Sequence, residues 1–288
     1  MRSFHYARPE TLSDALALIN EYGPNATVLA GGTDLIVRLR TGRALPAIVI
    51  DLKRVPALRA DICETGTFLR VGAGTVMTDL VADECVRSRF PALADAAHSV
   101  GSVQIRNRAT LAGNICNASP AADTATALLV YEAHVNLIST AGPRCVPLKD
   151  FFIGPGKTLR QPNELVESID LPLPDCKDGA CFERLTRRRG VDLATINLCC
   201  RVKATGETLF AFGAVAPTPL LVGDETGKLA NPNADPKERE AVLQSLVAHA
   251  SPISDVRAQK DYRSAMLLTL SRRALATAIE RLQLQEAK

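Results

Sequence analysis

Two glycine-containing segments have the residue types that could hold a phosphate. The first is Leu29-Ala30-Gly31-Gly32-Thr33-Asp34-Leu35, and the second is Thr110-Leu111-Ala112-Gly113-Asn114. Glycine has no Cβ to block a ligand and tolerates positive φ, and the amides that open a following helix point at an anion. Each segment alone is also typical of a simple turn. Because the two lie far apart in the chain, together they favour one long anionic ligand, a dinucleotide, held twice.

Other catalytic and binding patterns are missing or ambiguous. The first segment is neither Gly-x-Gly-x-x-Gly nor a P-loop, so a Rossmann or NTPase site is disfavoured. The four histidines have no metal-like spacing, and no Ser/His/Asp arrangement stands out. Asp123 precedes an apolar stretch and is expected to cap a helix, a position that can also face a ligand. Arg184 and the run 187–189 form either a solvated face or a contact to a cofactor or an electronegative partner.

Composition excludes several function classes. The 288 residues are 47% hydrophobic, enough for a core, and the net charge of +3 is too small to indicate nucleic acid or an anionic membrane. No apolar run has the length of a membrane span, and the first residues lack the apolar core of a signal peptide, so we expect a cytoplasmic protein. The eight cysteines are expected to be free thiols without an iron–sulfur cluster, and Cys199 and Cys200 should face opposite sides of a strand.

Hydrophobic spacing predicts the elements that position these residues. Thr11 and Asp14 predict the start of a helix that Gly23-Pro24 ends. Strands are expected at 26–30, 47–52, 67–73, 133–139, 181–185, 196–202 and 209–215. Helices are expected from 35, near 78–84 and 88–98, over 124–131, and twice at the end of the chain, the last with Leu268, Leu275, Ile279 and Leu282 on one face.

The best linker candidate is Leu171-Pro172-Leu173-Pro174-Asp175, which closes a stretch rich in proline and glycine. We therefore expect one domain over 1–175 and a second over 176–288. The first has an α/β character, and the second, with strands followed by helices, is α+β.

Several motifs, in order, resemble one family. They are the first glycine segment, Gln104-Ile105-Arg106-Asn107, Thr110-x-x-Gly113-Asn114-Ile115-Cys116-Asn117, Ser119-x-x-x-Asp123, Gly154-Pro155-Gly156-Lys157 and Phe212-Gly213-Ala214-Val215-Ala216-Pro217-Thr218-Pro219. Over nearly the whole chain they resemble the FAD-binding medium subunit of the molybdenum hydroxylases, which include xanthine dehydrogenase and aerobic carbon monoxide dehydrogenase. The last two motifs favour the branch that oxidises purines or other N-heterocycles.

The resemblance implies an α+β fold: a two-subdomain FAD-binding domain of the vanillyl-alcohol oxidase type, then a smaller C-terminal α+β domain. It implies that FAD binds non-covalently. Residues 29–35 (Leu29, Ala30, Gly31, Gly32, Thr33, Asp34, Leu35) would wrap the pyrophosphate, with Thr110, Leu111, Ala112, Gly113 and Asn114 on its other side. Asp123 would contact the flavin and ribityl region, Val100 or Gly101 the isoalloxazine ring, Val166 the flavin through its backbone, and Arg184 would stand beside the cofactor. Some relatives stack an aromatic side chain where this chain has Val100.

The resemblance also implies an oxidoreductase subunit without a catalytic acid, base or metal of its own. A large partner subunit would carry molybdopterin, and a small one would carry two 2Fe–2S clusters, as a heterotrimer or its dimer. Electrons would pass through FAD to NAD, a quinone, dioxygen or a carrier protein. The alternatives are a self-contained flavin oxidoreductase, in which Cys116 would be the candidate for covalent attachment, and a non-enzymatic nucleotide-binding module.

Overall fold

The computed structural model describes residues 2–287, and the chain opens with a small parallel sheet. Its strands β1 (His5–Ala7), β3 (Ile48–Asp51) and β2 (Ala26–Leu29) lie in the order β1-β3-β2. Helix α1 (Leu12–Tyr22) buries Ala15, Leu16 and Ile19 against Ile48 and Ile50 of β3. Helix α2 (Leu35–Arg40) follows β2 after a short loop. The predicted helix–strand–helix–strand order of this region is confirmed.

Helix α1 begins as its sequence predicts. The Thr11 hydroxyl accepts the Asp14 amide at 3.1 Å, and Gly23, with a φ of 50°, ends the helix. Because a lost N-cap leaves an amide without its partner, we expect Thr11→Ala to lower the free energy of unfolding by about 1 kcal/mol. Urea denaturation measures this, and Ser13→Ala, an exposed change inside the same helix, is the matched control. Equal stability of the two variants would contradict the capping role.

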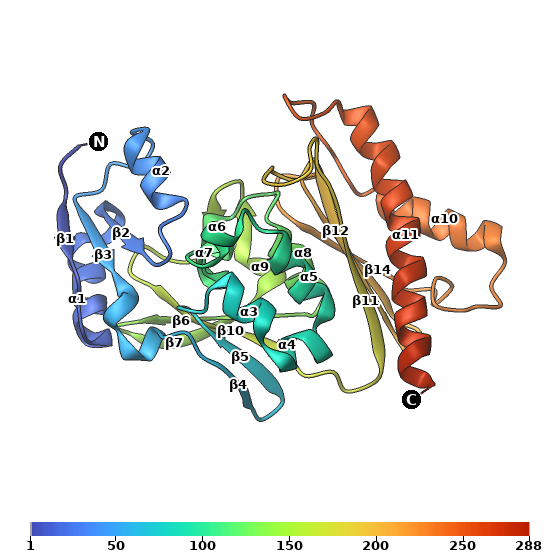
Figure 1. Ribbon diagram of the computed structural model, residues 1–288, viewed down its shortest axis with the longest axis horizontal. Helices are drawn as coiled ribbons and strands as arrows, with labels where there is room; N and C mark the ends of the chain where they lie inside the picture. Colours follow the sequence, from blue (N-terminus) through green and yellow to red (C-terminus); the bar gives the residue numbers. More distant parts are fainter. Residues whose placement is uncertain (1, 288) are drawn as a thin grey trace.

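The second sheet is antiparallel and lies beside the first (Figure 1). Its order is β4-β5-β10-β6-β7, with β4 (Ile62–Thr65), β5 (Phe68–Gly72), β10 (Leu165–Pro172), β6 (His134–Ser139) and β7 (Gly142–Pro147). The proline- and glycine-rich stretch thus contains a full strand. Pro143 and Pro147 are accommodated because β7 is an edge strand, where a missing N–H leaves no inner ladder bond broken. Leu171 and Pro172 belong to β10, so the linker prediction was wrong for these two residues.

Short helices cover this sheet. They are α3 (Met77–Ala82), α4 (Glu84–Arg89), α5 (Pro91–Ser99), α6 (Val103–Arg106), α7 (Leu111–Asn117), α8 (Asp123–Val130) and α9 (Leu148–Phe151), followed by a small hairpin of β8 (Phe152–Gly154) and β9 (Lys157–Thr158). The two helices predicted near 78–84 and 88–98 are three. Asp83 accepts the Val86 amide and starts α4, and Pro91 starts α5, so the chain is interrupted twice.

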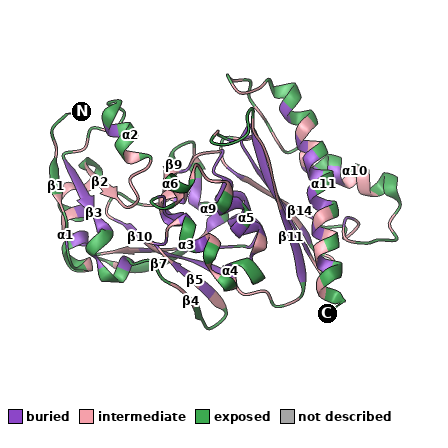
Figure 2. Cartoon of the chain, viewed as in Figure 1, coloured by how far each residue is buried: buried purple, intermediate pink, exposed green. Residues whose placement is uncertain are grey.

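The C-terminal sheet has the order β11-β12-β13-β14, with β11 (Asp178–Leu185), β12 (Ile196–Lys203), β13 (Thr208–Gly213) and β14 (Leu220–Asp224). Helices α5 and α8 lie on one face, and α11 (Lys260–Glu286) lies on the other, with α10 (Pro236–Val247) packed against α11 and β14 (Figure 1). Strand β12 is almost entirely buried between these layers, and the first half of β11 is buried as well; Figure 2 shows the buried residues along this sheet. Cys199 packs among the residues of the α5 and α8 side and Cys200 among those of the α11 side, as the strand pattern predicts.

The buried face of α11 differs in part from the predicted one. Leu275 and Leu282 are buried, whereas Leu268 and Ile279 are only partly buried. A Cβ at Gly179 of β11 would lie 1.9 Å from the Ala278 carbonyl oxygen, so helix and strand backbones meet closely there. This close approach turns Ala274 and Ala278 toward the sheet, which hydrophobicity alone did not indicate.

Candidate functional site

The first glycine segment forms the loop between β2 and α2. A Cβ on Gly31 would lie 1.9 Å from the carbonyl oxygen of Arg108, and Gly32 has a φ of 80°. Gly31 is therefore required because two backbones touch, whereas the sequence suggested a phosphate as the reason. The same contact brings the first segment alongside the second.

The first turn of α2 has free donors. The amides of Thr33, Asp34 and Leu35 have no hydrogen-bond acceptor among residues 2–287, while the next amide, that of Ile36, donates to Gly32 at 3.0 Å. Helix-opening amides that lack partners in the protein are the donors that an anion takes. This loop fits a phosphate through its backbone.

The second segment is not a loop, which corrects the sequence interpretation. Thr110 is the N-cap of α7, and its hydroxyl accepts the Gly113 amide at 3.0 Å. Leu111 donates to Thr75, and Asn114 donates to the Thr110 carbonyl, so several amides of this turn are already paired. A Cβ on Gly113 would meet only the Thr110 hydroxyl within 4 Å, which leaves the outer side of this turn open.

The two segments border one cavity of about 90 Å³. Ala30 and Gly31 line it from the first segment and Thr110 from the second. Sequence reasoning missed the remaining lining residues, which are Leu52, Lys53, Leu58, Ala73, Gly74, Val76 and Arg108. The strand expected over 67–73 leads into the turn that contains Gly74, but nothing in the sequence placed that turn beside Gly31. The Lys53 ammonium group is paired with buried Asp51 at 2.7 Å.

A side-chain hydrogen bond of Asp34 joins the first glycine segment to the end of α7. The Asn117 side chain at the end of α7 donates to the Asp34 carboxylate at 3.3 Å. Burial raises the pKa of Asp34, although the nearby Arg38 opposes this shift. The Asp34 carboxylate therefore belongs to the contact between the loop and α7.

Asp123 is the first residue of α8, and Ala122 occupies the cap position, so the N-cap prediction was wrong. Its buried carboxylate accepts the Asn197 side-chain amide at 2.7 Å and lies 3.3 Å from the Arg184 guanidinium. Burial raises the pKa of Asp123 to about 6, against the lowering effects of Arg184, Asn197 and Ser99. A carboxyl group whose pKa is raised by burial next to a specific charged partner is typical of a functional site.

Arg184 is held by three elements. It lies on β11 and donates to the Ser99 carbonyl at the end of α5 at 3.0 Å and to the Asp192 carbonyl. Val100, the next residue after Ser99, caps α5, and its carbonyl accepts Arg106 at 3.1 Å, while Gly101 has a φ of 54°. Val100, Gly101, Asp123 and Arg184 are thus brought together from parts distant in the sequence.

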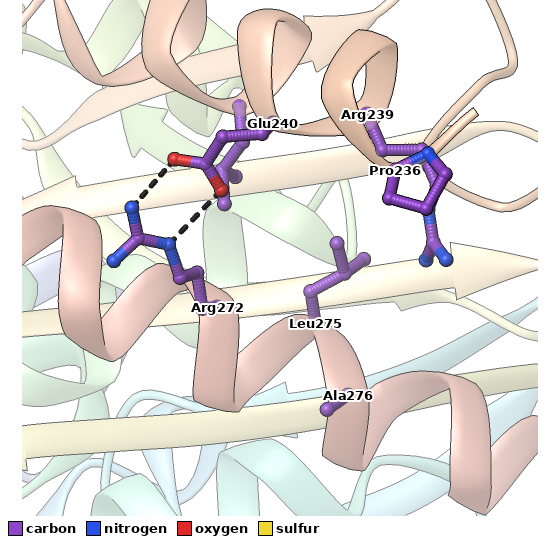
Figure 3. A pocket seen from close by; sticks show the side chains of 7 residues that line it. Pro236, Arg239, Glu240, Arg272, Leu275 and Ala276 are labelled. Atoms are coloured by element: carbon purple, nitrogen blue, oxygen red, sulfur yellow. Dashed lines mark hydrogen bonds and ion pairs between the residues drawn. The ribbon is translucent and has the colours of Figure 1, made fainter. Parts of the chain in front are cut away.

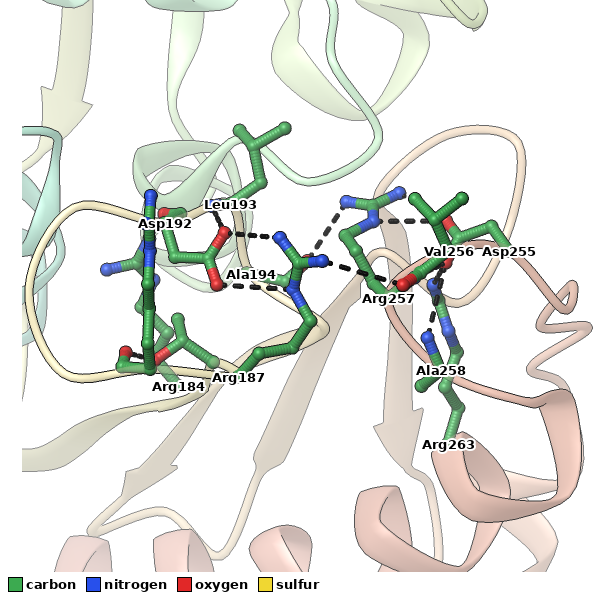
Figure 4. Close-up of polar contacts among 12 residues, drawn as sticks. Arg184, Arg187, Asp192, Leu193, Ala194, Asp255, Val256, Arg257, Ala258 and Arg263 are labelled. Carbon is green, nitrogen blue, oxygen red and sulfur yellow. Dashed lines mark hydrogen bonds and ion pairs between the residues drawn. The ribbon is translucent and has the colours of Figure 1, made fainter.

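The remaining arginines of the basic run separate from Arg184. Residues 187–189 are exposed, and Arg187 pairs with Asp192 in the loop between β11 and β12 (Figure 4). A second ion-pair group, in which Asp255 binds Arg257 and Arg263, lies next to it. Residues 187–189 are exposed, as a solvated face requires, and Arg184 alone of the four arginines contacts Asp123.

Val166 is buried in β10, at the point where the register with β6 shifts between Val166 and Ser168. The adjacent Glu167 carbonyl accepts the Ala73 amide at 3.0 Å, which places Val166 next to the turn that lines the cavity. A sheet irregularity next to a cavity frees backbone groups for other partners.

The larger surface cavity, about 200 Å³, lies between α10 and α11 and contains no predicted site residue (Figure 3). Glu240 and Arg272 at its rim pair with each other, so neither charge is available without breaking that ion pair.

Burial raises the pKa of the Cys116 thiol, which disfavours a nucleophilic thiolate there. All eight cysteines are free. No group of three or more possible metal ligands occurs within residues 2–287, and no helix in that range is long and apolar enough to cross a membrane.

Comparison with known proteins accounts for nearly the whole chain. Residues 2–174 match the model described as the FAD binding domain in molybdopterin dehydrogenase, and residues 180–278 match the CO dehydrogenase flavoprotein C-terminal domain. The xanthine dehydrogenase FAD-binding subunit of Escherichia coli is 33% identical over 281 residues, which cover 95% of each chain. The carbon monoxide dehydrogenase medium chain of Hydrogenophaga pseudoflava is 33% identical, with 96% of each chain covered. A solved structure of that enzyme lacking the Mo-pyranopterin moiety superposes with a TM-score of 0.89, at 34% identity and 97% and 98% coverage.

Proposed function

Because this chain belongs to the FAD-binding subunits of the molybdopterin dehydrogenases, we propose that it binds FAD between its two glycine segments and passes electrons to an external acceptor. The family and its oxidoreductase class follow from the matches above. The electron route, the individual binding residues and the substrate branch belong to the proposal.

The open amides of the first segment are the observation that carries it. Thr33, Asp34 and Leu35 present backbone donors without partners inside residues 2–287, and α7 begins directly beside them. Residues 29–35 would take one side of the pyrophosphate and residues 110–114 the other. Because several amides in the first turn of α7 already donate within the protein, the first segment contributes most of the backbone donors.

The flavin end of the cofactor would lie toward Asp123 and Arg184. Arg184 supplies a partly buried positive charge, and Val100, Gly101 and Val166 supply an apolar, backbone-rich surface. Bound FAD supplies the redox chemistry, while these residues orient it and set the charge around it. Arg184 would place a positive charge beside the bound flavin and would favour negative charge there, as donors do in an oxyanion hole.

The proposed assembly joins this chain to two other subunits. A large subunit with molybdopterin would oxidise a purine or other N-heterocycle, and a small subunit with two 2Fe–2S clusters would deliver the electrons. Xanthine, nicotinate and caffeine dehydrogenase subunits among the relatives support this branch, although carbon monoxide and glyceraldehyde dehydrogenases match as well. We also propose a domain boundary near residue 175.

The experiment is co-expression of the chain with candidate large and small subunits, followed by purification through a tag on this chain. We expect one acid-releasable FAD per chain, a flavin spectrum that a purine bleaches under anaerobic conditions, and re-oxidation by NAD, a quinone dye or dioxygen. Bleaching by substrate without any partner subunit would favour a self-contained oxidoreductase. A colourless chain that does not take up added FAD would exclude both flavoprotein functions.

A further inference from the structure

One row of the C-terminal sheet faces the start of α8. Arg184 pairs directly with Asn197, and Asn197 pairs with Gly213, across β11, β12 and β13. Directly paired residues of neighbouring strands point to the same face of a sheet. This row therefore presents a guanidinium, a carboxamide and a position without a side chain to the face where Asp123 lies.

The Asn197 side chain is oriented by all its contacts. It is fully buried, and its amide nitrogen donates to the Asp123 carboxylate at 2.7 Å and to the Ala121 carbonyl at 3.3 Å. Both N–H bonds are therefore used. A Cβ at Gly213 would lie 1.8 Å from the Asn197 Oδ1 atom, so only glycine leaves room for this carboxamide. Oδ1 itself has no hydrogen-bond partner in the described part of the chain.

A buried acceptor without a partner is costly, so a carboxamide at this place needs a reason. An apolar side chain of the same size would avoid that cost but would leave Asp123 without its shortest donor. The contact crosses the proposed domain boundary, because Asp123 opens α8 whereas Asn197 belongs to the C-terminal sheet.

We propose that Asn197 is a positioning residue that holds the Asp123 carboxylate ionised and oriented beside Arg184, so that the C-terminal sheet sets the charge at the flavin site. The effect on the flavin rests on the proposed contact of Asp123 with FAD, whereas the effect of Asn197 on the ionisation of Asp123 is independent of that contact.

The direction of the effect follows from the groups that face Asp123. Burial raises its pKa to about 6, while the charge of Arg184 on β11, the Asn197 donor on β12 and the nearby Ser99 on α5 lower it. Replacing Asn197 by leucine removes one group that lowers the pKa of Asp123 and makes its surroundings less polar. The pKa of Asp123 in Asn197→Leu must therefore rise, and Asp123 becomes neutral at a higher pH than in the unchanged chain.

The first test needs no cofactor. The full chain is labelled with ¹³C at aspartate carboxyl carbons, and the Asp123 resonance, assigned by its loss in Asp123→Asn, is followed over pH. We expect Asn197→Leu to raise the pKa of Asp123 by about one pH unit or more, as the loss of a hydrogen bond to a charged group implies. Gly213→Ala keeps the carboxamide but displaces it, and should shift the pKa in the same direction.

Thr208→Val is the matched control. Thr208 is equally buried in the same sheet, its hydroxyl also lacks a partner among the described residues, and it pairs with Val202 at the other end of β12. Its variant should leave the Asp123 pKa unchanged. A pKa within 0.3 pH unit (about the precision sought) of the unchanged chain in both Asn197→Leu and Gly213→Ala would overturn the proposal.

The second test uses the FAD-loaded chain. The flavin midpoint potential is measured as a function of pH with reference dyes, and its slope should change at the pKa of Asp123. This change of slope should move to a higher pH in Asn197→Leu and disappear in Asp123→Asn. When Asn197→Leu is combined with Asp123→Asn, it should change the potential no further than Asp123→Asn alone does. A potential insensitive to Asp123→Asn would refute the proposed Asp123–FAD contact. A change of slope that Asp123→Asn removes but Asn197→Leu leaves in place would refute the positioning role instead.

Discussion

Gly113→Val is expected to empty the flavin site while the fold persists. Gly113 lies in the first turn of α7, and outside the backbone of its own helix a Cβ there would meet only the Thr110 hydroxyl, at 2.8 Å. The rest of the valine side chain would extend to the outer side of the turn, where we place the pyrophosphate. Keeping the phosphate away from this turn, at the loss of about one hydrogen bond to a charged group, corresponds to an affinity for FAD that is about 10- to 100-fold weaker.

Fluorescence titration of the apo chain with FAD measures this loss. Gly154→Val is the matched control. Gly154 lies in the β8–β9 hairpin, and the nearest atom that a Cβ there would meet is 3.9 Å away. We expect the control to bind FAD as the unchanged chain does, and both variants to unfold cooperatively. Undiminished FAD binding by Gly113→Val would remove residues 110–114 from the proposed site.

Gly31→Ala is expected to damage both stability and FAD binding, although it adds a single methyl group. That methyl would lie 1.9 Å from the Arg108 carbonyl oxygen and 2.7 Å from its carbon, both backbone atoms that cannot rotate away. The β2–α2 loop must therefore separate from the segment before α7. Overpacking of this kind costs about 3 kcal/mol, a fall in melting temperature of roughly 6–12 °C for a chain of this size.

Calorimetry of the apo chain and FAD titration together distinguish Gly31→Ala from Gly113→Val. The first variant should lose stability without any cofactor present, whereas the second should lose mainly affinity. Gly154→Ala serves as the control. If Gly31→Ala melted with the unchanged chain, the close contact between the two segments would be refuted.

Local chemistry made a good part of the fold predictable. The start of α1 at Thr11, its end at Gly23, and the opposite facing of Cys199 and Cys200 all follow from interactions within a few residues. The strand β7 was hidden, because its prolines signal a loop unless the strand is known to lie at a sheet edge. Edge position is a property of the assembled sheet.

The candidate site divides in the same way. The glycine motifs and their order carried the family resemblance, which the comparisons confirm. The role of Gly31 was misjudged, because its neighbour Arg108 is distant in the sequence. The residue type and position of Asp123 indicated a helix cap, but its partners Arg184 and Asn197 lie on strands of the C-terminal sheet, far away in the sequence.

By itself, then, the amino-acid sequence determined the family, the FAD cofactor class and most of the helices and strands, because these depend on short motifs and on the periodicity of side chains. Only the tertiary structure decided that Gly31 touches a backbone, that Gly113 lies in a helix, and that Asp123 is buried between Arg184 and Asn197. Those outcomes depend on close approaches between distant segments, where a single Cβ or a single donor changes the local free energy by more than any local preference does.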